Sequence, residues 1–171
     1  MKTTTVVRGE EWISSTPLHI EIFQDFGFKP PKYAQVPNIL KEEDGKKRKI
    51  SKRKDPEAAV SYYHEEGIPS EAVCEYLTNI VNSSFESWRR ANQEKPITDF
   101  KVELNKMGVS GAVFDMVKLL DVSKNVIARL NANQVYDFVK AWADCYDEEL
   151  AEMLKDKEYG LKVFGIERDN S

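Results

Sequence analysis

The feature that most constrains this fold is a change in hydrophobic spacing at Asp55. From there on, apolar residues recur three and four positions apart, as on one face of an α-helix. The clearest stripes are Val73, Tyr76, Leu77, Ile80 and Val81, and then Val135, Phe138, Val139 and Trp142. Helix starts are expected at Asp55–Pro56, Ser70, Asp99, Ser123, Asn133 and Asp147. We therefore predict an all-helical region with a looser connector at residues 82–98, a last helix that Asp147 opens, and a frayed tail at 165–171.

The residues before Asp55 have a different pattern. A β-branched run at residues 3–7 predicts a strand that delivers Arg8 at its C-terminal end, where α/β folds place ligand-binding groups. A helix is predicted at residues 17–26 and an extended segment at residues 33–40. Two strands at most are too few for an independent sheet. The expected fold class is therefore mainly α, with a small α/β part that depends on packing against the helices.

Between these two parts lies a basic run, residues 46–54. Seven of its nine residues are Lys or Arg, although the formal net charge of the chain is −4. Such a cluster repels itself unless it binds an anion, and a loop that leads into a helix start at Asp55 favours a polyphosphate or a nucleic-acid backbone. The charge count alone also allows a solvated surface loop or a non-specific RNA-binding segment.

The internal order of the run separates these alternatives. Lys49-Ile50-Ser51-Lys52-Arg53 resembles the KMSKS loop of class I aminoacyl-tRNA synthetases, in the KISKR form of the glutamyl-tRNA synthetase family. The stretches VRGEEWISSTP, FGFKPP and VPNIL precede it in the order of that family's catalytic domain, and they begin at residues 7, 26 and 36. The similarity continues through GAVFDMVKL, which begins at residue 111, and on to the end of the chain.

The resemblance implies a domain organisation. Residues 1–54 would be the end of a class I, Rossmann-type catalytic domain, residues 55–130 a helical stem-contact domain, and residues 131–171 the start of the helical anticodon-binding region. The family's second signature, His-x-Gly-His, does not occur in the sequence, whose only histidines are His19 and His64. We therefore expect a piece of a larger synthetase, which is inactive as a ligase without the missing half.

The resemblance also assigns roles in the basic run. Amino-acid activation gathers negative charge on phosphoryl oxygens, so the protein must place cations there. Lys52 and Lys49 are the expected catalytic residues and ATP contacts, Ser51 shapes the loop, and Arg53 stands where the general class I motif has serine. ATP is then a substrate that brings Mg²⁺ with it, and no metal site is predicted in this chain.

Three residues upstream match the rest of the family's pocket. Arg8 matches the arginine that binds the substrate glutamate, because a guanidinium fits a carboxylate bidentately. The alternative for Arg8 is a structural ion pair at a strand end. Glu11 and Trp12 match positions that line the nucleotide side of the pocket, although Trp12 could instead be a large anchor residue at a helix start. His19 is interpreted as a packed helix residue rather than a base.

The implied partners are L-glutamate, ATP, glutamate tRNA and the missing N-terminal half, in the cytoplasm. Candidate tRNA contacts are the basic residues of the helical region: Arg89, Arg90, Lys101, Lys106, Lys118 and Arg129. No apolar run approaches the length of a membrane span. Cys74 and Cys145 have no companion residues at metal-ligand spacing, and they are interpreted as buried thiols in a reducing compartment.

A function from another class competes with the ligase. The chain could be a non-catalytic helical module whose basic loop binds RNA or a protein partner. ATP distinguishes the two, because a ligase segment contacts triphosphate through Lys52 and an RNA module ignores it. The sequence leaves open whether glutamine tRNA is also accepted.

Overall fold

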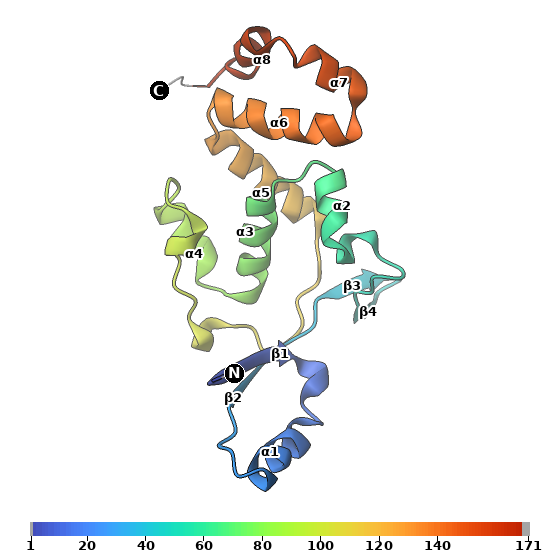
Figure 1. Ribbon diagram of the computed structural model, residues 1–171, viewed down its shortest axis with the longest axis vertical. Coiled ribbons are helices and arrows are strands. Elements are labelled where there is room, and N and C mark those ends of the chain that lie inside the picture. The colour runs from blue at the N-terminus through green and yellow to red at the C-terminus, as the bar shows by residue number, and fades with distance from the viewer. Residues whose placement is uncertain (1, 169–171) are drawn as a thin grey trace. The chain divides into compact units, whose positions relative to one another are not determined.

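The computed structural model describes residues 2–168, which fall into two units. The first unit holds the residues up to Ile50 together with Leu104–Phe114, and the second holds Ser51–Glu103 together with the residues from Asp115 on. The chain thus leaves the first unit at the end of the basic strand and returns to it once (Figure 1). As expected, the protein is mainly helical with small sheets.

A strand–helix–strand motif begins the first unit. Strand β1 (Thr5–Gly9) pairs in parallel with β2 (Lys32–Val36) along its whole length. The connection runs through the short 3₁₀ helix η1 (Glu10–Trp12) and the helix α1 (Thr16–Asp25). The predicted first strand and first helix are therefore confirmed. Pro37 follows the end of β2, where its missing N–H costs the sheet no hydrogen bond.

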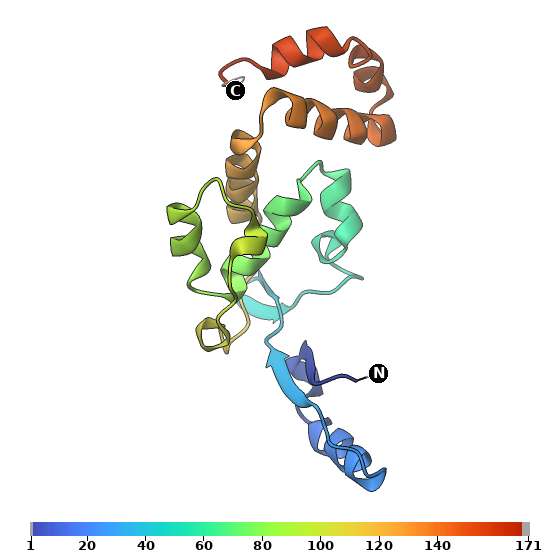
Figure 2. The same ribbon diagram turned by 60° about the vertical axis from the view of Figure 1, so that its left-hand side comes forward.

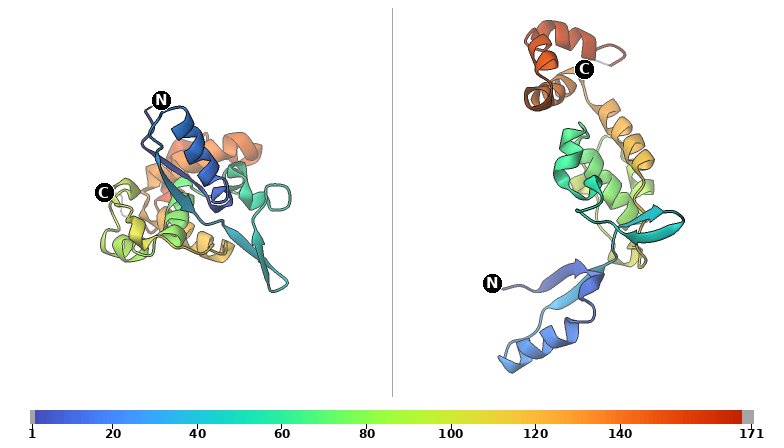
Figure 3. Two further views of the ribbon diagram at one scale, coloured as in Figure 1. Left: turned by 90° about the horizontal axis from the view of Figure 1, so that it is seen from below. Right: turned by 90° about the vertical axis from the view of Figure 1, so that its right-hand side faces the viewer.

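The first half of the basic run is a strand, not the expected loop. Strand β3 (Leu40–Glu43) pairs antiparallel with β4 (Lys46–Lys49), so this part of the chain has four strands instead of two at most. Asp44 and Gly45 have φ angles of 52° and 72°, which are typical of a two-residue type I′ turn. Figure 3 shows the resulting hairpin. Glu42 faces Lys47 and Glu43 faces Lys46 across it, and these opposite charges stabilise the pairing, whereas Lys41 faces the like charge of Arg48.

The returning segment completes the first unit. It includes the 3₁₀ helix η4 (Leu104–Lys106), and Leu40 forms a parallel bridge to Val113 on the side away from β4. Backbone hydrogen bonds of 2.7 and 2.8 Å join Leu40 to the two neighbours of Val113. A β-carbon at Gly111 would lie 2.6 Å from the carbonyl oxygen of Asn38, so only glycine fits this approach.

The second unit is helical (Figures 1 and 2). Its elements are η2 (Pro56–Ala58), α2 (Val60–Glu65), α3 (Ser70–Val81), α4 (Phe85–Ala91), η3 (Ile97–Asp99), α5 (Met116–Arg129), α6 (Ala132–Tyr146), α7 (Glu148–Met153) and α8 (Lys157–Phe164). Buried side chains of α3, α4 and α5 form one part of the core: Tyr76, Phe85, Leu119 and Val126. Tyr136, Ala143 and Leu154 form another part, which ties α6 to α7 and α8.

Several predicted helix boundaries were wrong. The start of α3 at Ser70 is confirmed, although Ser70 makes no capping hydrogen bond, whereas Ser123 lies buried inside the single helix α5 and starts no helix. The residue that caps α5 is Asp115. Asn131, not Asn133, caps α6 and forms a capping box with the side chain at the third helical position. Asp147 caps α7 as predicted.

Long-range contacts explain the largest correction, the absence of the helix expected from Asp99 to Met107. The ring of Phe100 packs 5.0 Å from Phe85, and the side chain of the buried Asn82 donates a hydrogen bond of 2.9 Å to the carbonyl of Glu103. These contacts hold residues 100–103 without helical structure, and Leu104, which was predicted to face inward, is 74% exposed at the start of η4. The predicted connector at 82–98 contains α4, the helix from Asp55 is divided between η2 and α2, and α8 follows the helix predicted to be last.

Two further expectations differ from the structure. Cys74 and Cys145 are exposed, so the prediction of buried thiols was wrong. The tail is ordered as far as Arg168, whose guanidinium donates hydrogen bonds of 2.8 and 2.6 Å to the carbonyls of Ile127 and Leu130 at the end of α5. A cation suits this position because the C-terminal carbonyls of a helix lack partners. Residues 169–171 lie outside the described residues.

Candidate functional site

Arg8 occupies a polar and aromatic pocket in the first unit. Strand β1 presents its guanidinium to the first turn of α1, where Nη1 lies 2.8 Å from Nδ1 of His19 and Nη2 donates to the Thr16 hydroxyl at 2.7 Å. The centre of the guanidinium lies 5.7 Å from the Trp12 ring and 4.8 Å from the Tyr33 ring. These partners were not predicted from the sequence, although Thr16 and His19 stand one turn apart in the helix that follows β1.

The surroundings of Arg8 do not support the alternative of a structural ion pair. Within residues 2–168, no carboxylate pairs with Arg8. Its Nε–H is buried and has no hydrogen-bond partner among these residues. An arginine that is held in place without a counterion is suited to bind a carboxylate from outside the chain.

Glu11 and Lys49 are brought together from distant parts of the sequence. Lys49 Nζ lies 3.0 Å from Glu11 Oε1, and both side chains are about half exposed. The pKa of the Glu11 carboxyl group is lowered from its ordinary value, first by its own backbone N–H and then by the hydrogen bond from Lys49. A β-carbon at Gly9 would collide with the Glu11 carboxylate, so glycine at this position leaves room for it. Two of the residues predicted at the nucleotide side of the pocket are therefore neighbours.

Trp12 lies at the edge of this group. It is 48% exposed, and its ring centre lies 6.1 Å from that of His19. The neighbouring Glu10 accepts hydrogen bonds from the backbone and the side chain of Asn38, at 3.0 and 2.8 Å, and so fixes η1 to the segment after β2. Because Glu10 supplies this attachment and Trp12 stays accessible, the ring of Trp12 is available to a ligand.

The second half of the basic run is a turn with free cations. The backbone N–H of Ser51 donates to the Asp55 carboxylate at 2.9 Å, and the carbonyl of Ser51 accepts from Asp55 at 2.8 Å. Asp55 itself is buried, with 1% exposure. Lys52 and Arg53 are exposed and form no ion pair with any part of the chain that the structure describes. Ser51 thus shapes the turn through its backbone, and no carboxylate of the described residues neutralises Lys52 or Arg53.

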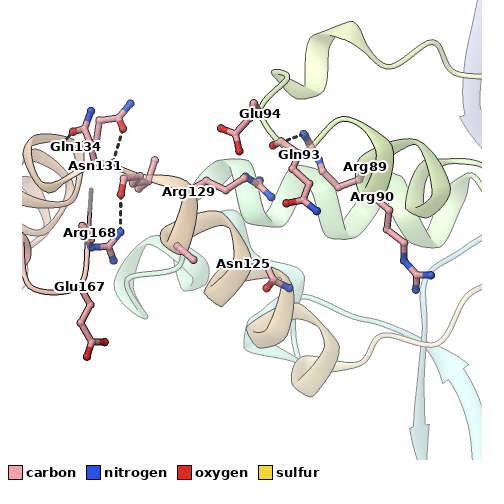
Figure 4. A pocket seen from close by; sticks show the side chains of 12 residues that line it. Arg89, Arg90, Gln93, Glu94, Asn125, Arg129, Asn131, Gln134, Glu167 and Arg168 are labelled. Atoms are coloured by element: carbon pink, nitrogen blue, oxygen red, sulfur yellow. Dashed lines mark hydrogen bonds between the residues drawn. The ribbon is translucent and has the colours of Figure 1, made fainter. Parts of the chain in front are cut away.

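A different group of basic residues lines an open polar cavity of about 950 Å³ in the second unit (Figure 4). Arg89 and Arg129 each place Nη2 2.6 Å from Oε1 of Glu75, whose side chain is only 4% exposed. The Arg129 contact is a hydrogen bond, whereas the N–H groups of Arg89 Nη2 are not aligned with the carboxylate. Arg90 instead is 78% exposed and pairs with Glu86 one turn away. Of the predicted tRNA contacts, Arg89 and Arg129 therefore already serve the helical core.

Neither a metal-ligand cluster nor a membrane-spanning helix occurs in the described part of the chain. Among residues 2–168, no group of three or more His, Cys, Asp or Glu side chains could hold a metal ion. None of the described helices combines the length and the apolar character that crossing a membrane requires.

Comparison with known proteins gives the same family along the chain. The family model of the class I tRNA synthetases (E and Q), catalytic domain, matches residues 1–121. A glutamate–tRNA ligase of Clostridium perfringens strain 13 is 52% identical over 170 residues, which are 99% of this chain and 31% of that protein. A glutamate–tRNA ligase of Sorangium cellulosum is 48% identical over 183 aligned residues, which cover 98% of this chain and 32% of the relative.

Solved structures support the same assignment. A crystal structure of a glutamate–tRNA ligase from Elizabethkingia meningosepticum, in complex with its amino acid, matches all of this chain and 36% of its own, with a TM-score of 0.69 and 25% identity. The chain thus spans about a third of the length of the relatives that it matches. Because the family model covers well over half of the sequence, this chain belongs to the class I tRNA synthetases of the glutamyl and glutaminyl type.

Proposed function

We propose that this chain is part of a glutamate–tRNA ligase, which activates L-glutamate with ATP and transfers it to tRNA. The observation that carries the proposal is the assembly of Arg8, Glu11, Trp12 and Lys49 in one unit at the end of β1. These residues come from two separate segments of the sequence, and the resemblance assigned all four to the substrate pocket. Their proximity supports that assignment independently of the sequence motif.

Arg8 is the proposed glutamate-binding residue. Its guanidinium is held by neutral partners and keeps N–H groups unused, so a substrate carboxylate would be its counterion. Trp12, half exposed beside it, is proposed to line the nucleotide side of the same pocket.

Lys52 and Lys49 are the proposed catalytic contacts to the phosphates of ATP. Ser51 and Arg53 belong to the same turn as Lys52, and Glu11 forms an ion pair with Lys49. Pyrophosphate departs with negative charge, and a cation that no protein carboxylate neutralises stabilises the transition state most effectively. Among residues 2–168, Lys52 meets this condition, whereas Lys49 is paired with Glu11. Mg²⁺ is proposed to arrive with the ATP phosphates, and no residue of this chain is assigned to it.

The helical unit is proposed to contact glutamate tRNA. We propose the end of the catalytic domain at residues 1–54, a stem-contact domain at 55–130 and the start of the anticodon-binding region at 131–171. Among the basic residues of this region, the exposed Arg90 is better placed for RNA than the buried Arg89. ATP, free amino acid and tRNA occur together in the cytoplasm, where we propose that the protein works.

The test is glutamate-dependent ATP–pyrophosphate exchange, with tRNA present because activation in this branch can require it. We propose that the chain is inactive alone and needs the segment of the synthetase that carries the His-x-Gly-His signature. Exchange is therefore measured with the chain alone, with that segment alone and with both. Activity only in the mixture supports the proposal. A mixture that forms a complex and remains silent contradicts it and favours the non-catalytic helical module.

A further inference from the structure

The contacts of Arg8 determine the chemical state of the histidine beside it. An arginine guanidinium carries five N–H donors and no acceptor, and it stays protonated in proteins. In the 2.8 Å contact between Arg8 Nη1 and His19 Nδ1, the histidine must therefore be the acceptor. The proton of His19 then lies on Nε2, and the ring is neutral.

Thr16 holds the other arm of the same guanidinium. Its hydroxyl accepts hydrogen bonds from Arg8 Nη2 at 2.7 Å and from Gln35 Nε2 at 2.8 Å, and it donates to the Trp12 carbonyl at 2.8 Å. The hydroxyl has no further hydrogen to give, so its orientation is fixed. Thr16 and His19 are the first and fourth residues of α1, so one turn of this helix accepts hydrogen bonds from both Nη atoms of the guanidinium.

After these contacts, one N–H group on each Nη atom has no hydrogen-bond partner among residues 2–168. Each Nη carries two N–H bonds and spends one on α1. The rings of Trp12 and Tyr33 restrict the plane of the guanidinium from their own sides. A guanidinium whose orientation is fixed in advance can bind a carboxylate with little loss of side-chain entropy.

We propose that His19 is a positioning residue for amino-acid binding: its neutral ring, as an acceptor at Nδ1, orients Arg8 toward the carboxylate of the substrate. This inference rests on the proposed function. We expect His19 to act on amino-acid binding more than on phosphate binding, because neither Lys49 nor Lys52 contacts it. Its ring lies 6.1 Å from that of Trp12, so the KM for ATP is measured beside the KM for glutamate. A purely structural histidine would affect both substrates through the fold.

The first test needs no catalysis. Long-range ¹H–¹⁵N correlation spectra of the 171-residue chain distinguish the two neutral tautomers of His19 from the charged ring. The inference requires an unprotonated Nδ1 and a protonated Nε2 at neutral pH. A proton on Nδ1 would remove the acceptor and overturn the inference.

The second test separates positioning from folding. In the reconstituted exchange assay, His19→Leu keeps side-chain bulk and removes the acceptor, so the KM for glutamate should rise about tenfold or more while the KM for ATP changes less than about twofold. His19→Asn places an amide oxygen near the former Nδ1 and should restore most of the loss. His64→Leu, a change in the second unit, is the matched control and should leave both KM values unchanged.

The possible outcomes separate a failure of the role of His19 from a failure of the ligase function. An unchanged KM for glutamate in an active His19→Leu enzyme, or equal rises for glutamate and ATP, overturns the role of His19 and leaves the ligase function standing. Absence of exchange in the wild-type mixture overturns the ligase function and the inference together.

Discussion

Two groups of basic residues in this chain are both candidates for binding phosphate groups, but their surroundings in the structure differ. Lys52 and Arg53 stand in an exposed turn without protein counterions in the described residues. Arg89 and Arg129 converge on one buried carboxylate, that of Glu75. A cation that already pairs with a protein carboxylate attracts a phosphate group only weakly, whereas an exposed cation without a protein partner attracts it more strongly. The difference shows that exposure and pairing, not the number of basic residues, locate a polyanion site.

The largest expected effect comes from breaking the buried group. Glu75→Gln removes the charge that holds Arg89 and Arg129 next to each other, and it should lower the free energy of unfolding by about 3–5 kcal/mol. Urea unfolding followed by far-ultraviolet circular dichroism measures the change. Glu86→Gln breaks the exposed pair with Arg90 and should cost less than about 0.5 kcal/mol. Equal effects of the two changes would show that Glu75 does not hold the helical unit together.

The next effect concerns the exposed group and acts on catalysis rather than on folding. Lys52→Ala should lower the rate of pyrophosphate exchange about 100-fold or more, because it removes a cation aimed at the phosphoryl oxygens. Its unfolding curve should match that of the wild type, since Lys52 has no partner among residues 2–168. Lys54→Ala, in the same turn, should retain activity within about threefold. A comparable loss in both variants would mean that overall charge matters and that Lys52 has no special position.

A smaller effect is expected where the returning segment meets the basic hairpin. Gly111→Ala puts a β-carbon 2.6 Å from the Asn38 carbonyl oxygen, and relief of this overlap should cost about 1–3 kcal/mol. Hydrogen exchange of the β3–β4 amides should accelerate in the variant. Gly108→Ala, whose β-carbon would lie at an ordinary contact distance of 3.7 Å from the Ser110 carbonyl oxygen, serves as control. If both variants exchange like the wild type, the contact at Gly111 does not support the hairpin.

The smallest effect is a pH dependence. The pKa of Glu11 is lower in the folded protein than in the unfolded chain, so its contribution to stability is present above the unfolded pKa and is lost as the pH falls through the folded one. Lys49→Ala should raise the pKa of Glu11 only in part, because the hydrogen bond to its own backbone N–H remains. A carbon-detected titration of the Glu11 carboxyl group measures both values. An identical midpoint in the two proteins would exclude the Lys49 interaction in solution.

Local signals were sufficient for part of the fold. The helix predicted at residues 17–26 is α1, because a first-turn proline, Pro17, and a left-handed glycine after the last turn, Gly27, act within one or two turns. The hairpin could also have been found, since Asp44-Gly45 is a strong type I′ signal. The excess of charge around it favoured a loop instead.

Long-range contacts account for what the sequence did not show. The extended segment after Asp99 depends on the packing of Phe100 on Phe85, and no periodicity reveals that contact. The pairing of Arg129 with Glu75 links residues far apart in the sequence, so both arginines were open to assignment as RNA contacts. The residues of the candidate pocket were easier to predict, because Arg8, Glu11 and Lys49 belong to stretches that match the family, whereas His19 lies outside these stretches.

The most direct test of the central claim is which lysines ATP covers. The chain and its complementary segment are acylated at lysine, with ATP, with AMP or without nucleotide, and labelling is quantified by mass spectrometry. ATP should protect Lys52 strongly while AMP, which lacks the β- and γ-phosphates, should not, and Lys118 and Lys124 on α5 should react equally in all three samples. Equal labelling of Lys52 with and without ATP would contradict the assignment of this turn as the triphosphate site.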